Sequence, residues 1–204
     1  MQGVGMTETS PGAIFLDPAD AMRKIGSTGK ELLHTEARIV NEDGEEAGPN
    51  EVGELWVRGP HITPGYWNRP DATAEAFVDD WLRTGDAAKR DDEGFYYIVD
   101  RWKDMYISGG ENVYPAEVEN YLFRHPAVRE VQVFGVPDEK FGEEVCAWIV
   151  LAQDAAASAE EIIAFCRENM ARFKVPKNVI FGDLPKTSTG KVQKFVLRER
   201  AKEQ

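Results

Sequence analysis

The stretch DRWKDMYISGGENVYPAEVENYLF, residues 100–123, decides the fold because the pattern of the chain changes within it. Before it, short β-branched and aromatic runs separated by acidic turns predict mostly β structure. Within it, residues 105–108 look like a strand, and Pro115 stands where a helix to about residue 124 would open. We therefore expect an α+β chain with a domain boundary here, between residues 1–102 and residues 103–204.

The remaining patterns supply further elements for each half. In the first half they predict strands at residues 37–40, 54–59 and 95–99, and a short helix to residue 77 that Asp71 caps. In the second half Ser158 and Glu161 form a capping box before an apolar helical stripe. Further strands are expected at residues 128–136, 144–151 and 179–181, and a basic helix from about residue 192. Residues 1–13 show no periodicity and look cut from something larger.

The 204 residues carry a formal net charge of −12, and this charge is unevenly distributed. An acidic chain is a poor match to nucleic acid or anionic membranes, whose phosphates favour basic surfaces. Residues 172–202 nevertheless hold nine Lys or Arg against two acids. This basic end suggests a small anionic ligand, and a solvated basic face explains the same count equally well.

Several common kinds of site are excluded by spacing. The longest apolar run, residues 145–152, is too short for a membrane span, and residues 1–15 lack a signal-peptide pattern, so we expect a soluble, cytoplasmic protein. Neither Gly-Lys pair, at residues 29–30 and 190–191, has the spacing of a phosphate-binding P-loop. The three histidines are far apart with no Cys pair near them, which argues against a zinc site, and no Gly-x-Ser-x-Gly elbow suggests a hydrolase.

Four polar segments remain, and their order along the chain is the informative feature. Residues 5–9, Gly-Met-Thr-Glu-Thr, place hydroxyls and a carboxylate on a turn suited to nucleotide-bound Mg²⁺. Thr84-Gly85-Asp86 offers a carboxylate at an expected turn, where it can accept from a ribose diol. Residues 100–112 combine a charge cluster with a glycine pair, and residues 185–191 present a lysine on a polar loop. Each segment alone is more often an ordinary turn.

Together these segments resemble the adenylate-forming superfamily, which comprises acyl-CoA synthetases, peptide-synthetase adenylation domains and luciferases. The resemblance covers the whole chain and follows the family's order at residues 53–65, 84–86, 100–119 and 185–194. It implies a β-rich subdomain from the end of the family's large domain, then a complete small α+β C-terminal domain. The family's phosphate loop and most of its acyl pocket precede this region, so we expect the chain alone to be inactive.

The resemblance implies nucleotide-binding roles for residues of the first half. Glu8 would hold Mg²⁺, and Thr7 would lie against the phosphates of ATP. Asp86 would bind the ribose hydroxyls, and Arg101 would contact ribose or phosphate. Val4 departs from the family pattern, because it stands where the family usually has an aromatic residue that stacks on adenine. ATP and Mg²⁺ are therefore the implied ligands of this half.

The resemblance also implies a two-step reaction. In the family, ATP and a carboxylic acid give an acyl-adenylate and pyrophosphate, and a thiol, usually of coenzyme A, then displaces AMP. Lys191 would be the catalytic residue, because its ammonium would offset negative charge in the first step. Lys103 would be the hinge about which the small domain turns between steps. Gly109 and Gly110 would let the pantetheine arm of coenzyme A pass close to the backbone.

Within the family, residues 107–115, 135–138 and 190–198 look most like medium- or long-chain fatty acyl-CoA ligases. The resemblance thus implies a fatty acid, ATP and coenzyme A as partners, with no nucleic acid and no integral membrane segment. Two alternatives stay open: a non-catalytic nucleotide- or partner-binding remnant, and an adenylation domain that acylates a carrier protein.

Overall fold

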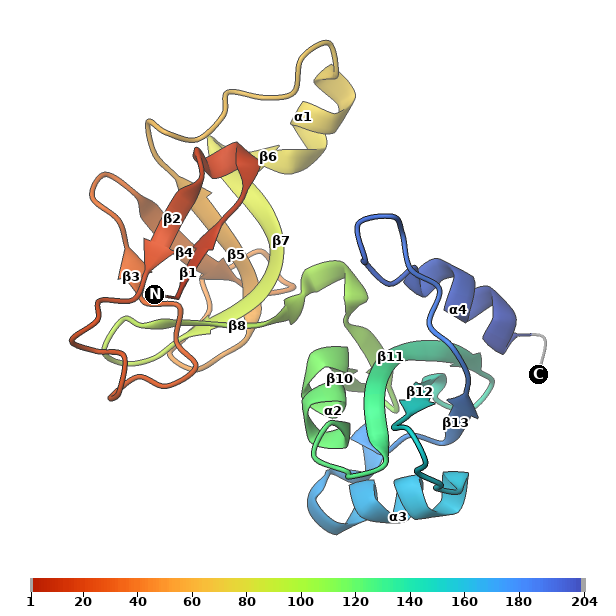
Figure 1. The fold of residues 1–204 in the computed structure, drawn as a ribbon. Coiled ribbons are helices and arrows are strands. Elements are labelled where there is room, and N and C mark those ends of the chain that lie inside the picture. Colours follow the sequence, from red (N-terminus) through yellow and green to blue (C-terminus); the bar gives the residue numbers. More distant parts are fainter. Residues whose placement is uncertain (1, 203–204) are drawn as a thin grey trace. The chain divides into compact units, whose positions relative to one another are not determined.

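The computed structural model describes residues 2–202, and its contacts divide the chain into two units, Met1–Lys103 and Asp104–Gln204. The first unit is built mainly from antiparallel strands, and the second combines one sheet with helices (Figure 1). This mixed architecture confirms the predicted α+β class.

Two antiparallel sheets build unit 1. The elements are β1 (Gly3–Gly5), β2 (Gly12–Phe15), β3 (Lys30–Glu31), β4 (Glu36–Val40), β5 (Gly53–Arg58), α1 (Pro70–Ala76), β6 (Phe77–Val78), β7 (Trp81–Arg90) and β8 (Tyr96–Arg101). One sheet has the order β1-β2-β3, and the other has the order β4-β5-β7-β6, with β8 also paired to β7. Buried side chains from both sheets, among them Ile14, Leu55 and Tyr96, join in one apolar core.

Unit 1 departs from the sequence expectations in three places. Residues 2–13, which show no periodicity, contain regular structure because β1 pairs with β2. Thr84-Gly85-Asp86 lies inside the ten-residue strand β7 and not at a turn. Arg69 is the N-cap of α1 in place of Asp71, because Pro70 occupies the first helical position. The Asp71 carboxylate instead accepts from the Arg69 guanidinium at 3.1 and 3.2 Å.

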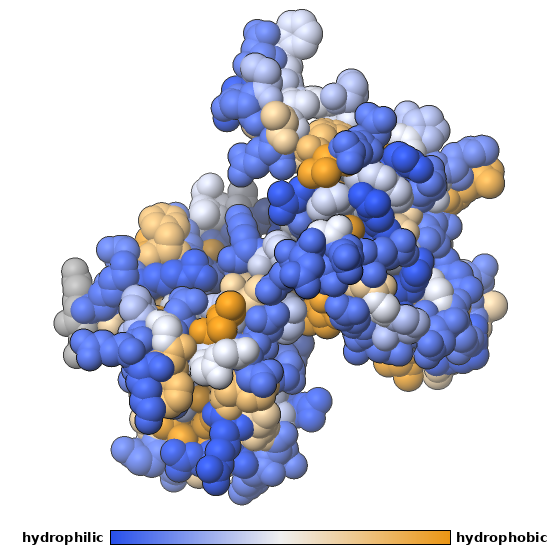
Figure 2. Space-filling view, turned by 180° about the vertical axis from the view of Figure 1, so that it is seen from behind, coloured by the Kyte–Doolittle hydropathy of each residue, from blue (hydrophilic) through white to orange (hydrophobic). Residues whose placement is uncertain are grey.

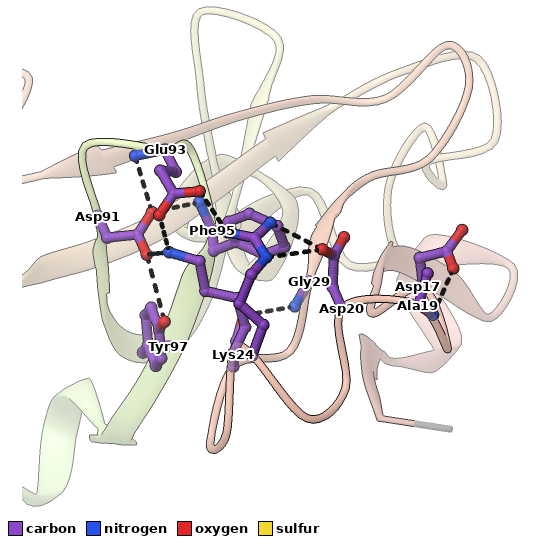
Figure 3. Close-up of polar contacts among 11 residues, drawn as sticks. Asp17, Ala19, Asp20, Lys24, Gly29, Asp91, Glu93, Phe95 and Tyr97 are labelled. Carbon is purple, nitrogen blue, oxygen red and sulfur yellow. Dashed lines mark hydrogen bonds and ion pairs between the residues drawn. The ribbon is translucent and has the colours of Figure 1, made fainter.

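A network of charged side chains attaches the loop at residues 17–29 to the turn between β7 and β8 (Figure 3). Lys24 Nζ lies 2.7 Å from the Asp91 carboxylate and 2.6 Å from that of Glu93. The Lys24 side chain is 11% exposed, and its ammonium stands 4.8 Å from the centre of the Phe95 ring. Because two carboxylates and an aromatic face surround this lysine, we assign it a structural role.

One sheet with apolar cores on both faces forms unit 2. Its elements are β9 (Tyr106–Ser108), β10 (Glu111–Val113), α2 (Pro115–Leu122), β11 (Val128–Asp138), β12 (Gly142–Leu151), α3 (Ala159–Asn169), β13 (Asn178–Phe181) and α4 (Lys194–Ala201). The strand order is β10-β9-β12-β11, and β13 pairs in parallel with β12. Successive residues of β12 point to opposite faces. Val145 and Ile149 pack with α2 and α3, whereas Cys146 and Trp148 pack with Leu197 of α4.

The local signals of unit 2 are confirmed. Ser158 Oγ accepts from the Glu161 amide at 3.2 Å, and Glu161 Oε2 accepts from the Ser158 amide at 2.8 Å, which completes the capping box of α3. Pro115 opens α2, which ends at Leu122, two residues before its expected end. β11 and β12 are each two residues longer than expected, because they pair with each other as one long hairpin.

The surface carries apolar side chains in small patches. On the face shown in Figure 2, most of the surface is hydrophilic. Trp67, Met22 and Leu33 are among the large apolar side chains that are exposed. Single exposed apolar residues are normal in globular proteins, and we assign these no role. Within residues 2–202, no helix has the length and apolar character needed to cross a bilayer.

Candidate functional site

A β-bulge in unit 1 carries Asp86. The pairing of β7 with β5 shifts register here, so that residues 84–86 lie opposite Leu55 alone. Gly85 takes a φ of +71°, a left-handed conformation that favours glycine. Thr84 Oγ1 donates to the Leu55 carbonyl at 2.7 Å and accepts from the Asp86 amide at 3.1 Å. The bulge therefore takes Asp86 out of the regular alternation of β7, a common device beside functional sites.

A buried carboxylate supports this bulge. Glu54 of β5 is 5% exposed. Its Oε1 accepts from the Gly85 amide at 3.2 Å, and its Oε2 accepts from Arg83 Nε and Trp56 Nε1, both at 2.9 Å. Sequence reasoning missed Glu54, although a charged residue within the buried run GELWVR was a usable signal, because an isolated buried charge is costly.

Asp86 pairs with Arg101, so the structure brings together two residues that the resemblance assigns to the nucleotide. They are register partners on β7 and β8, and the guanidinium forms an ion pair with the carboxylate. The Asp86 side chain is 16% exposed and the Arg101 side chain 53% exposed. A carboxylate acceptor beside a partly accessible guanidinium donor is suited to bind hydroxyl groups and an anion together.

Glu8 and Thr7 lie in a short 3-10 turn between β1, which contains Val4, and β2. Tyr66 Oη donates to Glu8 Oε1 at 2.8 Å, and the Thr63 amide donates to the Glu8 carbonyl at 2.8 Å. The bond to the carboxylate raises the pKa of Tyr66, because ionising the phenol would place two negative charges together. Tyr66 lies 58 residues from Glu8 along the chain, and no local sequence signal could have found this contact.

Glu8 suits a cation that arrives with a phosphate. Across residues 2–202, no three His, Cys, Asp or Glu side chains gather as a metal-binding cluster. Mg²⁺ is commonly held by one or two carboxylates together with substrate phosphates. The half-buried Glu8, which follows Thr7 in the same turn, therefore fits Mg²⁺ bound to a nucleotide.

Lys191 lies on a loop of unit 2, between β13 and α4, that is organised by Thr187. The Thr187 amide donates to the Lys191 carbonyl at 2.8 Å, and Thr187 Oγ1 accepts from the Lys191 amide at 3.2 Å. The Gly190 amide donates to the Thr187 carbonyl at 2.9 Å, and its φ of +83° favours glycine. Lys191 is exposed, so the loop presents a positive charge to its surroundings.

The loop runs into a charged anchor at the start of α4. Lys194 Nζ lies 3.5 Å from Asp104 and 3.8 Å from Glu119, and the Arg198 guanidinium lies 3.9 Å from Asp104. Asp104 directly follows Lys103, the expected hinge, and the boundary between the two units falls between these residues. The anchor thus links the base of the Lys191 loop to the first residue of unit 2.

Gly109 and Gly110 form the two-residue turn between β9 and β10. Their φ values of +62° and +88° suit a type I′ hairpin, which favours glycine at both positions. A Cβ on Gly110 would meet nothing within 4 Å, and one on Gly109 would meet the Phe141 ring at 3.4 Å. Backbone conformation therefore explains the glycine pair better than crowding does, and the turn is open to an approaching ligand.

Comparison with known proteins gives two matching families. "AMP-binding enzyme" matches residues 1–67, and "AMP-binding enzyme C-terminal domain" matches residues 117–191. The chain belongs to the adenylate-forming superfamily. The o-succinylbenzoate CoA synthetase of Bacillus subtilis, solved with its acyl-adenylate intermediate, superposes with a TM-score of 0.88 and 42% identity over 98% of this chain and 40% of that chain. The same synthetase has also been solved with ATP and a magnesium ion.

Two curated relatives of this chain are acyl-CoA ligases. The chain is 47% identical over 201 residues to feruloyl-CoA synthase of an Amycolatopsis species, covering 98% of this chain and 41% of that protein. It is 48% identical over 200 residues to the mitochondrial medium-chain acyl-CoA ligase ACSF2 of Mus musculus, covering 96% of this chain and 32% of that protein. The chain therefore spans about two fifths or less of the length of these relatives.

Proposed function

We propose that this chain is the C-terminal part of an ATP-dependent ligase that joins a medium- or long-chain fatty acid to coenzyme A. The acid and ATP would give an acyl-adenylate and pyrophosphate, and coenzyme A would then displace AMP to leave the thioester. The observation that carries the proposal is the Asp86–Arg101 pair on the supported bulge, because it presents an acceptor and a cation together. The acyl-adenylate bound by a relative of the same fold supports this proposal.

In unit 1 the nucleotide would meet side chains that accept from hydroxyls and neutralise phosphate. The Asp86 carboxylate would accept from the ribose hydroxyls, and Arg101 would donate to ribose or phosphate. Glu8 would hold Mg²⁺ that arrives with ATP, with Thr7 against the phosphates. Mg²⁺, when bound, would offset charge on the phosphate oxygens. Tyr66 holds one oxygen of Glu8, which leaves the carboxylate oriented.

In unit 2, Lys191 would act in the first step. Attack of the carboxylate on the α-phosphate builds negative charge on the phosphoryl oxygens, and an ammonium offsets that charge where a neutral side chain cannot. The loop around Thr187 supports this role, because it fixes the backbone of Lys191 while the residue stays exposed.

The second step needs access for a thiol. Lys103, at the boundary of the two units, would be the pivot between the two half-reactions. The open turn at Gly109 and Gly110 would let the pantetheine arm pass close to backbone. Basic residues between 172 and 202 other than Lys174, Lys186 and Lys194, whose ammonium groups pair with carboxylates of unit 2, would meet the phosphates of coenzyme A.

The acid is the least constrained part of the proposal. The similarity to a medium-chain acyl-CoA ligase supports a fatty acid. The nearly equal similarity to feruloyl-CoA synthase names an aromatic acid as the competitor that an experiment must include.

The test measures both steps with the complete gene product that contains this chain. We expect pyrophosphate exchange into ATP, and then a coenzyme A thioester, with octanoate and palmitate in preference to ferulate and o-succinylbenzoate. Preference for ferulate would overturn the fatty-acid assignment but would leave the proposed coenzyme A ligase activity standing. Transfer to a carrier protein in place of coenzyme A, or no adenylate with any acid, would overturn the ligase itself. A polypeptide of residues 1–204 alone should form no thioester.

A further inference from the structure

Glu54 is an unusual charged group. Among residues 2–202 it is the one acidic side chain that is buried, at 5% exposure, and all its known partners are donors. A buried charge persists only where hydrogen bonds and countercharge offset its loss of water. Here the Arg83 guanidinium supplies the countercharge, and two neutral N–H groups supply the remaining bonds.

The donors place Glu54 beneath the bulge. Arg83 and Gly85 flank Thr84 on β7, and both donate to the same carboxylate across the gap between the strands. The register shift removes the Gly85 amide from the regular pairing of β5 with β7, so that Glu54 supplies its acceptor. Glu54 therefore fixes the backbone on the N-terminal side of Asp86.

A second contact fixes the other side of the same turn. Thr84 Oγ1 bonds both to the Leu55 carbonyl and to the Asp86 amide. With the Gly85 and Asp86 amides both held by side chains, the direction of the Asp86 carboxylate follows from the bulge. Its pairing with Arg101 then completes the arrangement.

We propose that Glu54 is a positioning residue that acts through Asp86: it sets the place at which the Asp86 carboxylate accepts from the hydroxyls of a bound ribose. This inference rests on the proposed function, because the ribose role of Asp86 belongs to it. Glu54 itself touches no substrate. Glutamine cannot replace it, because glutamine has one acceptor oxygen for three donors and turns an N–H group toward one of them.

The experiment compares Glu54→Gln with Glu36→Gln in the complete gene product. Glu36 is a matched control, because its carboxylate lies 2.6 Å from Arg58 in the same sheet, away from the bulge. The probes are AMP and 2′,3′-dideoxy-AMP, whose affinities are measured by calorimetry. We expect Glu54→Gln to lower the affinity for AMP about tenfold, which is the scale of one hydrogen bond to a charged group. The affinity for the dideoxy nucleotide should change by less than about twofold, because it has no hydroxyls for Asp86 to bind.

A purely structural role gives a different result. If Glu54 only stabilised the sheet, both nucleotides would lose affinity equally, and that result would overturn the proposal. Should Glu54→Gln fail to fold, Arg83→Lys carries the same comparison, because lysine removes the Nε–H donor and keeps the charge. Loss confined to AMP in that variant supports the proposal, and equal loss overturns it.

Hydrogen exchange separates this inference from the proposed function. In the nucleotide-free protein, Glu54→Gln should accelerate exchange of the Gly85 amide by at least about tenfold, whereas Glu36→Gln should leave it unchanged. If the Gly85 amide exchanged at an unchanged rate in Glu54→Gln, the claim that Glu54 supports the bulge would be overturned, whatever the nucleotide affinities are. Failure of the unmodified protein to bind AMP would overturn the proposed function and, with it, the role of Glu54 toward ribose.

Discussion

Asp86 in unit 1 and Lys191 in unit 2 are held in opposite ways. Asp86 lies in a bulge of β7 that is held by the Glu54 carboxylate and the Leu55 carbonyl, which both belong to β5, some thirty residues away in sequence. Lys191 lies on a loop whose bonds come from Thr187, four residues away. In the proposed function, the residue that binds ribose is thus placed by the folded sheet, whereas the residue that would supply the catalytic charge is placed by a local turn.

This difference matches what each residue would have to do. A group that binds the ground state gains from being fixed before the ligand arrives, because less ordering is then needed on binding. A group that meets charge only in one step need be present only in that step. We therefore expect changes at the bulge to alter nucleotide affinity and changes at the loop to alter one rate.

The largest expected effect is at Lys191. Lys191→Ala should lower acyl-adenylate formation by about two to three decades, the usual loss for one charge-stabilising contact in the transition state. Thioester formation from supplied acyl-adenylate should survive, and AMP affinity should stay within about twofold. The measurement follows pyrophosphate release and acyl-adenylate consumption separately.

Lys186 provides the control for Lys191. It belongs to the same loop but its ammonium is paired with Glu130 at 2.5 Å, so Lys186→Ala should leave both steps nearly unchanged. If Lys191→Ala slowed the two steps equally, the lysine would serve both or neither. The contrast between a fixed ribose ligand and a step-specific cation would then fail.

The next effect in size is at Asp86. Asp86→Asn keeps the shape of the side chain and removes its charge. It should lower the affinity for AMP by about ten- to a hundredfold, because hydrogen bonds to charged groups are stronger than those between neutral groups. The affinity for 2′,3′-dideoxy-AMP should change much less. Calorimetry measures the affinities for both nucleotides, and an equal loss of affinity for the two would show that Asp86 does not bind ribose.

A smaller effect is expected at Lys103. This residue lies outside both the Asp86 bulge and the Lys191 loop, and it is the last residue of unit 1. Proline there restricts φ and removes a donor, which hinders a pivot more than folding; it should slow thioester formation on the order of tenfold. Adenylate formation should be largely intact. Single-turnover kinetics of each step test this, and a matching loss in both steps would argue against a hinge.

The same contrast explains what the sequence could predict. The capping box of Ser158 and the helix start at Pro115 are local signals, and both are confirmed. The bulge is not local: Thr84-Gly85-Asp86 has the composition of a turn, and its place inside β7 depends on pairing with β5. The role of each candidate residue came from the resemblance and stays a prediction.

Contacts between distant segments were out of reach for the same reason. Tyr66 and Glu8 meet only because the fold brings together residues 58 positions apart. Residues 2–13 lack a pattern, yet β1 forms because β2 supplies its hydrogen-bond partners. Glu54 was the one non-local feature with a sequence signal, a carboxylate in an otherwise apolar strand.

The smallest expected effect separates the two units by their stability at alkaline pH. Both cysteines belong to unit 2, and burial raises the pKa of Cys146 to about 12 and that of Cys166 to about 11, from an ordinary 9.0. Above pH 9 the unfolded state loses thiol protons that the folded state keeps, so the free energy of unfolding of unit 2 should fall as pH rises. At pH 9.5 the contribution of Cys146 to this loss should be about 1 kcal/mol. The free energy of unfolding of unit 2 is measured by urea unfolding at pH 8 and at pH 9.5, with pulse alkylation of Cys166 as the probe. Cys146→Ala should flatten the pH dependence. An unchanged dependence in that variant would show that the Cys146 thiol does not contribute.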